Sequence, residues 1–382
     1  MTTLAQPSTA AAPSGQSDAK SRYRLVDTDI HHCLSGSHDL LPYLSTYDRA
    51  RLKGFGMGGT GDPYAYNGGV HGRRAEVVDQ GDAWVEPGSQ IDKVIRDHLD
   101  HSGVDVGILT GQSVYGASAL GDFHYAASLC RAFNDWTIEH WLPRDGRFRF
   151  CMAIGTQDPL AASKEIDRVG GHPQICGVLM PGGSPRPFGQ RFYHPIYEAC
   201  CRHGLTPAIH FFSEGGGINP SPTPAGFPGS YAESRASRFT VYLAHLASLI
   251  YEGVFEIFPQ MKFAMLECGF AWVPSTLWRM DSDWKALRQQ VPWVKRLPSE
   301  YVIDHVRFNS QPIDEPPKRQ DVKQLVAWMH GEHTLMFGSD FPHWDYDDPA
   351  HTLTELPEPL RQRVMADNAA DTFNLLPLDP TP

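Results

Sequence analysis

The stretch Val26-Asp27-Thr28-Asp29-Ile30-His31-His32 has the pattern of a short strand that runs into a polar end. Because side chains alternate between the two faces of a strand, Asp29 and His31 are expected on one face and their neighbours on the other. A carboxylate and an imidazole spaced two residues apart can bind the same divalent cation. A solvated turn with incidental polar residues would look similar, so the interpretation depends on the rest of the chain.

Downstream of this stretch, strand-length apolar segments alternate with helix-length segments. The eight expected strands cover Arg24–Ile30, Val104–Thr110, Phe148–Ile154, Ile175–Met180, Leu205–His210, Lys262–Glu267, His305–Asn309 and Thr334–Gly338. The helices expected between and after them cover about Ser89–His101, Phe123–Trp141, Pro159–Val169, Pro195–His203, Ala232–Glu252, Pro274–Gln289, Arg319–His330 and Pro359–Phe373. Several strands are almost continuously apolar, as buried parallel strands are. Eight such units favour an α/β fold of the closed (β/α)8 TIM-barrel class over an open sheet.

Composition sets the wider expectations. Residues 1–22 and 377–382 are expected to be tails, the first of them disordered, around a single barrel domain at 23–376. The net charge of −11, without a basic run, argues against nucleic-acid binding. No apolar stretch reaches membrane-spanning length, and the seven irregularly spaced cysteines are typical of reduced thiols in a cytoplasmic protein.

The segment Ser35–Pro87 shows no clear periodicity. Gly54, Gly56 and Gly59 fit the G-x-G-x-x-G pattern formally, but a dinucleotide site needs a helix immediately afterwards. Asp62-Pro63 and further glycines exclude that helix. We therefore expect a mobile loop insertion that covers a pocket on the active face of the barrel.

The predicted strands end in polar residues. Asp29 and His31 close the first strand, His210 closes the fifth, and Asp340 follows the eighth. Because catalytic sites in such barrels lie at the C-terminal ends of the strands, these four side chains are expected to meet at one mouth. Nitrogen and oxygen ligands of this kind suit one divalent metal ion, zinc, with manganese or iron as less specific alternatives. Taken singly, each residue also fits a hydrogen-bonded or turn position.

Three segments together carry a resemblance to a known family. Asp27-Thr28-Asp29-Ile30-His31, Pro207-Ala208-Ile209-His210 and Phe337-Gly338-Ser339-Asp340-Phe341-Pro342-His343 resemble the amidohydrolase superfamily. The most similar branch is the amidohydrolase-related group that includes aminocarboxymuconate-semialdehyde decarboxylase. The resemblance extends from Arg24 to Leu376 and implies a distorted (β/α)8 barrel with one divalent metal. By position, Asp29, His31, His210 and Asp340 match the family's metal ligands.

The chain departs from this pattern at the sixth strand. Decarboxylases of the family commonly carry a histidine there, whereas this chain has Glu267-Cys268-Gly269. We expect Glu267 to serve as a catalytic base, or His245 on the preceding helix to reach the site instead. Alternatively, His245 has no role in the site and is an ordinary residue of the helix. Glu267, at the end of an apolar strand, needs a hydrogen-bonding partner or water whether or not it is catalytic.

These features predict a metal-dependent hydrolase. A bound metal lowers the pKa of its water toward about 7, producing a nucleophile that attacks an amide, ester, lactone or activated carbon–carbon bond. Asp340 would accept the proton of that water, and Asp340 or Glu267 would return it to the leaving group. The alternative is a non-oxidative decarboxylase, in which the metal binds a substrate carboxylate and carbon is protonated as carbon dioxide leaves. A barrel that binds its ligand without catalysis is the third hypothesis.

The residues near the proposed mouth indicate a substrate class. Arg74 beside Arg73 would clamp a carboxylate, since the guanidinium fork matches its geometry. Phe212, His343 and Trp344 would contact an aromatic or conjugated acidic small molecule. The same loop aromatics would equally suit a contact between subunits, so a homo-oligomer, a dimer or a tetramer, is expected. A solvated pair at Arg73-Arg74 is the structural alternative.

Overall fold

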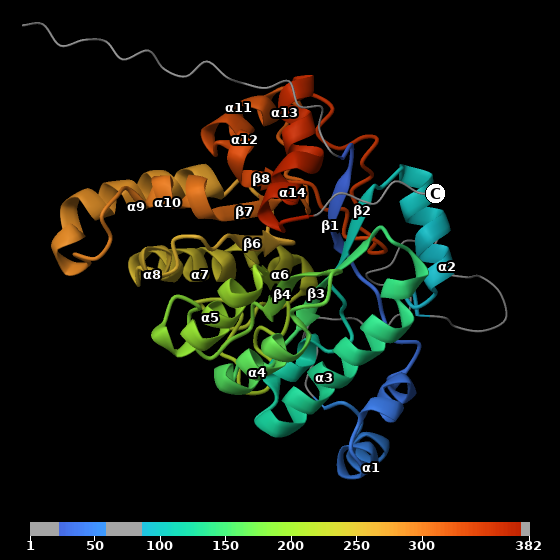
Figure 1. Ribbon diagram of the computed structural model, residues 1–382. Helices are drawn as coiled ribbons and strands as arrows, with labels where there is room; N and C mark the ends of the chain where they lie inside the picture. Colours follow the sequence, from blue (N-terminus) through green and yellow to red (C-terminus); the bar gives the residue numbers. More distant parts are fainter. Residues whose placement is uncertain (1–22, 59–85, 376–382) are drawn as a thin grey trace, which may run out of the picture.

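Eight parallel strands form the centre of the computed structural model, which describes residues 23–58 and 86–375. The strands are β1 (Val26–Ile30), β2 (Val106–Leu109), β3 (Phe148–Ala153), β4 (Ile175–Pro181), β5 (Thr206–His210), β6 (Phe263–Leu266), β7 (Val306–Asn309) and β8 (Leu335–Met336). They pair in sequence order, and all of their residues are buried. The eight predicted strands are therefore confirmed (Figure 1).

The sheet closes on itself through backbone hydrogen bonds between β1 and the segment after β8. The N–H of Thr28 donates to the carbonyl of Phe337 at 3.1 Å. The N–H of Asp340 donates to the carbonyl of Asp29, also at 3.1 Å. The predicted TIM-barrel class is thus confirmed, and its closure brings the polar ends of the first and last strands together.

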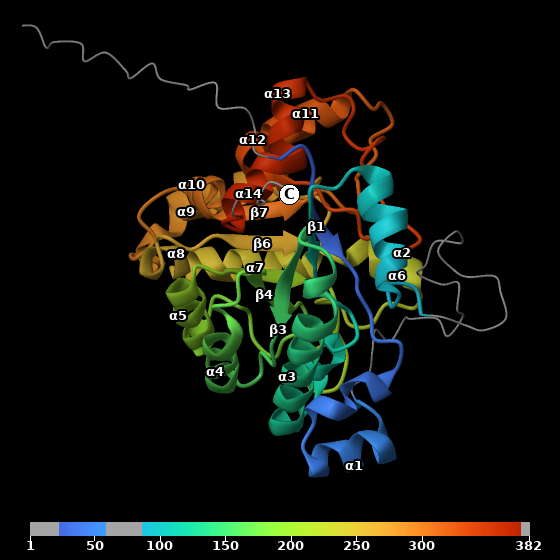
Figure 2. The ribbon, with the colours of Figure 1, turned by 45° about the vertical axis from the view of Figure 1, so that its right-hand side comes forward.

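Helices surround the barrel. They are α1 (Thr46–Phe55), α2 (Ile91–Val94), α3 (Phe123–His140), α4 (Pro159–Val169), α5 (His194–His203), α6 (Tyr231–Ser237), α7 (Phe239–Tyr251), α8 (Val254–Ile257), α9 (Val273–Leu287), α10 (Pro298–His305), α11 (Asp321–Trp328), α12 (Gly331–Thr334), α13 (Glu358–Gln362) and α14 (Asn368–Thr372). In Figure 2, β6 runs across the view and its arrow points toward α6, which marks the side of the mouth.

Three predicted helices are divided in the structure. The helix expected at about Ser89–His101 consists of α2 and a π-helical segment, Ile95–Asp100. The single helix expected at about Ala232–Glu252 is divided into α6 and α7 at Arg238. The last helix is divided by a π-helical turn, Arg363–Asp367, between α13 and α14. The division between α6 and α7 lies at Arg238, whose side chain is buried.

The segment Ser35–Pro87 is not wholly irregular, so that prediction was wrong in part. It contains α1, whose first turn is capped by Ser45, since the hydroxyl accepts the N–H of Asp48 at 3.1 Å. Figures 1 and 2 both show α1 at the periphery, away from the strands. The remainder of the expected loop, residues 59–85, lies outside the described residues.

Two further observations concern composition. Among the described residues, no helix combines the length and hydropathy needed to cross a lipid bilayer. No disulfide joins cysteines in the described part of the chain, and six of the seven are buried. Their thiols therefore act as small core side chains.

Candidate metal centre

Four side chains meet at the C-terminal ends of the strands. Asp29 belongs to β1, His31 follows it, His210 ends β5, and Asp340 follows β8. One candidate ligand atom from each lies within 4.8 Å of those from the other three, and all four residues are buried. The structure thus brings together the four residues that the sequence indicated as metal ligands.

The hydrogen bonds of the two histidines fix which ring nitrogen faces the cluster. Nδ1 of His31 lies 2.8 Å from the carbonyl of Gly111, and Nδ1 of His210 lies 2.8 Å from the carbonyl of Phe211. A carbonyl only accepts, so each Nδ1 carries the proton and each Nε2 of a neutral ring presents a lone pair. Neither Nε2 atom has a hydrogen-bond partner among the described residues. Buried Nε2 lone pairs that face carboxylates without a hydrogen bond are typical of side chains able to hold a cation.

The carboxylate of Asp340 is also buried beside the cluster without a hydrogen bond of acceptable geometry to either oxygen among the described residues. Its Oδ1 atom lies 2.8 Å from Nε2 of His31 and 2.7 Å from Nδ1 of His343. The backbone of Asp340 has φ 63°, a strained conformation that a non-glycine residue adopts where the surroundings enforce it.

The electrostatics of the cluster show a shortage of positive charge. Burial raises the pKa of Asp29, but the charges of His210 and His31 outweigh it and hold that pKa at about 2. Burial lowers the pKa of His210, but Asp29 outweighs it and raises that pKa to about 9. Burial, reinforced by the charge of Glu267, moves the pKa of Asp340 well above its usual range. A divalent cation would supply the charge that these groups otherwise draw from protons, so two imidazoles and two carboxylates fit such an ion.

Neighbouring polar residues orient Asp29. Its Oδ1 accepts from the hydroxyl of Thr110 at 2.8 Å, and its Oδ2 accepts from the amide of Asn309 at 3.3 Å. Thr110 and Asn309 stand at the ends of β2 and β7. Both oxygens are therefore fixed by strands on the same mouth of the barrel.

Asp27 ties the ends of β1 and β8 together. Its Oδ1 accepts from the backbone N–H groups of Asp29 at 3.1 Å and Ser339 at 2.9 Å. Its Oδ2 lies 2.5 Å from the Ser339 hydroxyl and 2.6 Å from Nε2 of His98. This buried network holds the residues next to Asp340, so it sets the position of that carboxylate.

Glu267 also reaches the cluster. It belongs with His31, Asp340 and His343 to a second group whose candidate ligand atoms lie within 4.8 Å of one another. Its other carboxylate oxygen forms a buried ion pair with Arg238. The residue that replaces the family histidine is therefore at the site, as the sequence suggested.

His245 does not reach this cluster. Its Nδ1 accepts from the N–H of Phe188 at 3.1 Å, and its Nε2 lies 2.9 Å from the carbonyl of Gly182. The ring stacks on Phe188 at a centroid distance of 4.2 Å. Because both nitrogens are engaged by backbone groups, the role of His245 is structural, and we do not retain it as a base.

The four residues expected to bind substrate have different environments. His343 stacks on His31 at 4.3 Å, and the half-buried Phe212 packs on Tyr115 at 5.3 Å. Trp344 is 51 % exposed and lies 5.1 Å from the guanidinium of Arg235. Arg74 lies outside the described residues. Of the four, His343 contacts the cluster directly.

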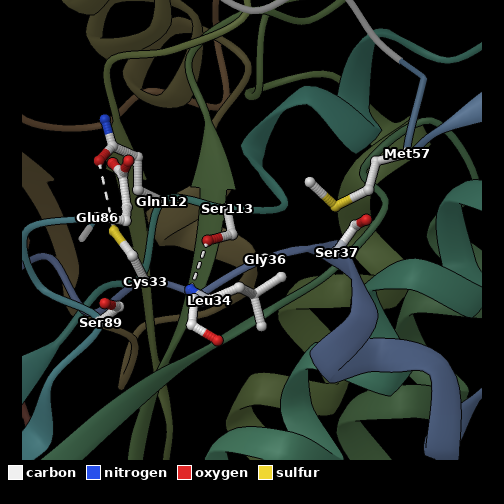
Figure 3. Close-up of a pocket in the computed structure, with 10 residues that line it drawn as sticks. Cys33, Leu34, Gly36, Ser37, Met57, Glu86, Ser89, Gln112 and Ser113 are labelled. Atoms are coloured by element: carbon white, nitrogen blue, oxygen red, sulfur yellow. Dashed lines mark hydrogen bonds between the residues drawn. The ribbon is translucent and has the colours of Figure 1, made fainter. Parts of the chain in front are cut away.

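A cavity of about 400 Å³ adjoins the mouth beside β1 and β2. Its lining combines apolar and polar side chains, among them Cys33, Ser113 and Gln112 (Figure 3). Oε1 of Gln112 lies 3.4 Å from Nε2 of His343, and Nδ1 of the same ring lies 2.7 Å from Oδ1 of Asp340. The cavity is therefore linked to the cluster by two side chains.

Sequence reasoning missed several residues of the site. Thr110 closes an apolar strand, so the rule that selected His210 would also have selected it. Asn309 was noted as a strand end without a role. Tyr115, whose ring lies 5.1 Å from that of His210, and Arg238 are brought in by tertiary packing and carry no local signal.

Comparison with known proteins adds two kinds of similarity. The sequence model of a family described as Amidohydrolase matches residues 82–375. A gamma-resorcylate decarboxylase of Polaromonas sp. is 22% identical over 293 residues, which is 72% of this chain and 85% of that enzyme. The match therefore extends across most of both proteins.

Solved structures share the fold at low sequence identity. An amidohydrolase from Mycobacterium avium subsp. paratuberculosis has a TM-score of 0.70 at 19% identity, covering 92% of this chain and 99% of that one. A 5-carboxyvanillate decarboxylase from Novosphingobium aromaticivorans, complexed with manganese and 4-hydroxy-3-methoxy-5-nitrobenzoic acid, has a TM-score of 0.65 at 18% identity. The coverage there is 92% of this chain and 96% of the other, and it supports the barrel fold.

Proposed function

Because the chain belongs to the amidohydrolase family, in its decarboxylase-like branch, we propose that it is a metal-dependent decarboxylase of hydroxylated aromatic acids. The observation that carries this proposal is the buried cluster of Asp29, His31, His210 and Asp340, whose candidate ligand atoms lie within 4.8 Å of one another. The names of the similar enzymes favour decarboxylation over the hydrolysis that the sequence first suggested. Hydrolysis remains an outcome of the test below.

Asp29, His31, His210 and Asp340 would hold the metal ion. When bound, the ion supplies positive charge that withdraws electron density from oxygen atoms of the substrate. A similar structure is described with manganese, so we propose manganese as the ion. The zinc expected from the sequence remains an alternative that metal analysis of the purified protein would decide.

Asp340 is the proposed proton carrier. It would deliver a proton to the ring carbon that bears the carboxylate. The bond to the carboxylate then breaks, its electron pair restores the aromatic ring, and carbon dioxide leaves. His343, whose Nδ1 lies 2.7 Å from Oδ1 of Asp340, would return a proton to Asp340. One proton is consumed for each carbon dioxide released.

The reaction is tested with manganese-loaded protein and a panel of benzoic acids that carry a hydroxyl group beside the carboxylate. In deuterated water, the proposal predicts release of carbon dioxide and one deuterium at the vacated carbon. The same panel, with esters and amides added, is run in 18O-labelled water. Labelled oxygen in the product, without carbon dioxide, would establish hydrolysis in its place.

A matched pair of variants tests the role of Asp340. Asp340→Asn retains the shape of the side chain but cannot carry the proton, so turnover should fall by about 10²–10⁴-fold. Asp347→Asn is the control: Asp347 belongs to neither ligand group and its Oδ2 accepts the N–H of Ile313 at 3.0 Å, so turnover should stay near that of the unaltered protein. Near-normal turnover by Asp340→Asn would remove Asp340 from this role.

A further inference from the structure

Glu267 occupies an unusual position at the end of β6. Its side chain is buried and its backbone has φ 49°, in the left-handed region that favours glycine. Oε2 lies 3.3 Å from Nε2 of His210, while Oδ2 of Asp29 lies 3.4 Å from the same nitrogen. Two carboxylates thus approach Nε2 of His210, whereas the ring proton is on Nδ1, which donates to the carbonyl of Phe211.

The distances match those between ligands of a shared ion. Two atoms bound to one ion at about 2.1 Å, and at right angles to each other, lie about 3 Å apart. Oε2 of Glu267 lies 3.3 Å from Nε2 of His210, and Oδ1 of Asp340 lies 2.8 Å from Nε2 of His31. Glu267 is also grouped with His31 and Asp340 within 4.8 Å. Glu267 thus lies beside His31, His210 and Asp340, whereas Asp29 belongs to the first group only.

The first turn of α7 holds Glu267 in this orientation. Arg238, which precedes α7, forms the ion pair with Oε1 and lies over the ring of Phe211 at 3.7 Å. One turn further on, the hydroxyl of Tyr242 donates to the carbonyl of Leu266. One carboxylate oxygen and the preceding backbone are thereby fixed, which leaves Oε2 directed to the cluster.

We propose that Glu267 is a fifth protein ligand of the cation, positioned by Arg238. The inference rests on the metal centre of the proposed function, though not on the reaction it catalyses. Three carboxylates and two imidazoles form a harder ligand set than two of each, which shifts selectivity toward manganese relative to zinc. With five protein ligands, an ion that takes six would have one position for water or substrate.

The unaltered protein gives the first test. It is stripped with a chelator, loaded with Mn²⁺ alone, and examined in 17O-enriched water by electron–nuclear double resonance. One coordinated water is expected if Glu267 is the fifth ligand of a six-coordinate ion. Two coordinated waters would overturn the proposal, because a protein ligand would then be missing.

The second test measures the Mn²⁺ dissociation constant of variants. The double variant Glu267→Gln with Arg238→Met removes the carboxylate without leaving an unpaired buried guanidinium, which protects the fold. Its affinity for Mn²⁺ should be weaker by about tenfold or more. The matched control is the double variant Asp345→Asn with Arg235→Met, because this ion pair, at 2.5 Å, contributes no residue to either ligand group.

The outcomes distinguish the role of Glu267 as a ligand from the existence of the metal centre. Weaker binding by the double variant, with the control within about twofold of the unaltered protein, supports Glu267 as a ligand. Equal loss in both variants would indicate a general charge effect and overturn the proposal. Failure of the unaltered protein to bind Mn²⁺ would also overturn the metal centre on which the proposed function depends.

Discussion

His31 and His32 are adjacent in the chain and both buried, yet they belong to two different regions. His31 faces the mouth of the barrel, where Nε2 meets Asp340 and Asp29. His32 faces the layer between strands and helices, where Nε2 lies 2.9 Å from the hydroxyl of Thr137. Burial alone therefore does not indicate function. The two rings differ in their neighbours: carboxylates surround His31, whereas aromatic side chains surround His32.

The chemistry of the two rings follows from these surroundings. His32 stacks parallel to Trp136 and packs against the ring of Phe133 at 5.1 Å. Burial, aided by the charge of His31, lowers the pKa of His32 to about 3, so the ring stays neutral and holds helix α3 against the barrel. His31, in contrast, lies among carboxylates that would hold the proposed cation. Four predictions test this contrast, from the largest expected effect to the smallest.

His31→Ala should abolish tight metal binding. It removes a direct ligand, so the loss of affinity should exceed the roughly 10–100-fold typical for loss of an outer partner. Decarboxylation should disappear with the metal. Calorimetric titration with Mn²⁺ and metal analysis after dialysis measure the effect. Retention of one ion per chain would contradict the assignment of His31.

His32→Ala is the matched variant on the other face. It should leave one ion per chain in place but lower the free energy of unfolding by about 2 kcal/mol, because it opens a cavity among aromatic rings. Denaturant unfolding at neutral pH measures this. If His32→Ala lost the metal while keeping its stability, the contrast between the two histidines would fail.

Ser339→Ala tests the network that supports Asp340. The variant loses the hydroxyl that donates to Asp27 at 2.5 Å and accepts the N–H of Phe341 at 3.1 Å. Metal affinity should fall by about tenfold, since outer partners orient the ligands. Ser275→Ala, on the exposed side of α9, is the control and should change nothing.

The smallest effect concerns pH and His245. Burial outweighs its hydrogen bond to Gly182 and lowers the pKa of His245 from 6.5 to about 4. The unfolded chain therefore binds this proton first, and the group's contribution to stability is lost as pH falls from about 6.5 toward 4. Thermal melts at pH 7.5 and 5 should show a smaller difference for His245→Gln than for the unaltered protein. An unchanged difference would argue against this role for His245.

Much of the fold followed from local patterns. Buried parallel strands are apolar along their whole length, so all eight were found, and β5 could be placed by Thr206–His210 alone. The four cluster residues could be predicted because they follow three strands whose C-terminal ends a barrel brings to one mouth, although each residue taken singly has a structural explanation. The capping serine of α1 was an available signal that the sequence analysis did not use.

The positions of Arg238 and His245 relative to the cluster could not be predicted from local sequence patterns. Arg238 lies between α6 and α7 and pairs with Glu267, which is 29 residues away in the chain, so only tertiary packing brings it to the site. His245 lies on the same helix as Tyr242, and its distance from the cluster depends on how α7 packs. Periodicity specifies which face of a helix is apolar but not which turn reaches the mouth.

The central claim is that remote side chains gather around a single cation. Anomalous X-ray diffraction at the manganese edge, from crystals of Mn²⁺-loaded protein, tests it most directly. The account predicts one peak per chain, bonded to Nε2 of His31 and of His210 and to the carboxylates of Asp29 and Asp340. A peak elsewhere in the protein, with these atoms bonded only to one another or to water, would contradict it.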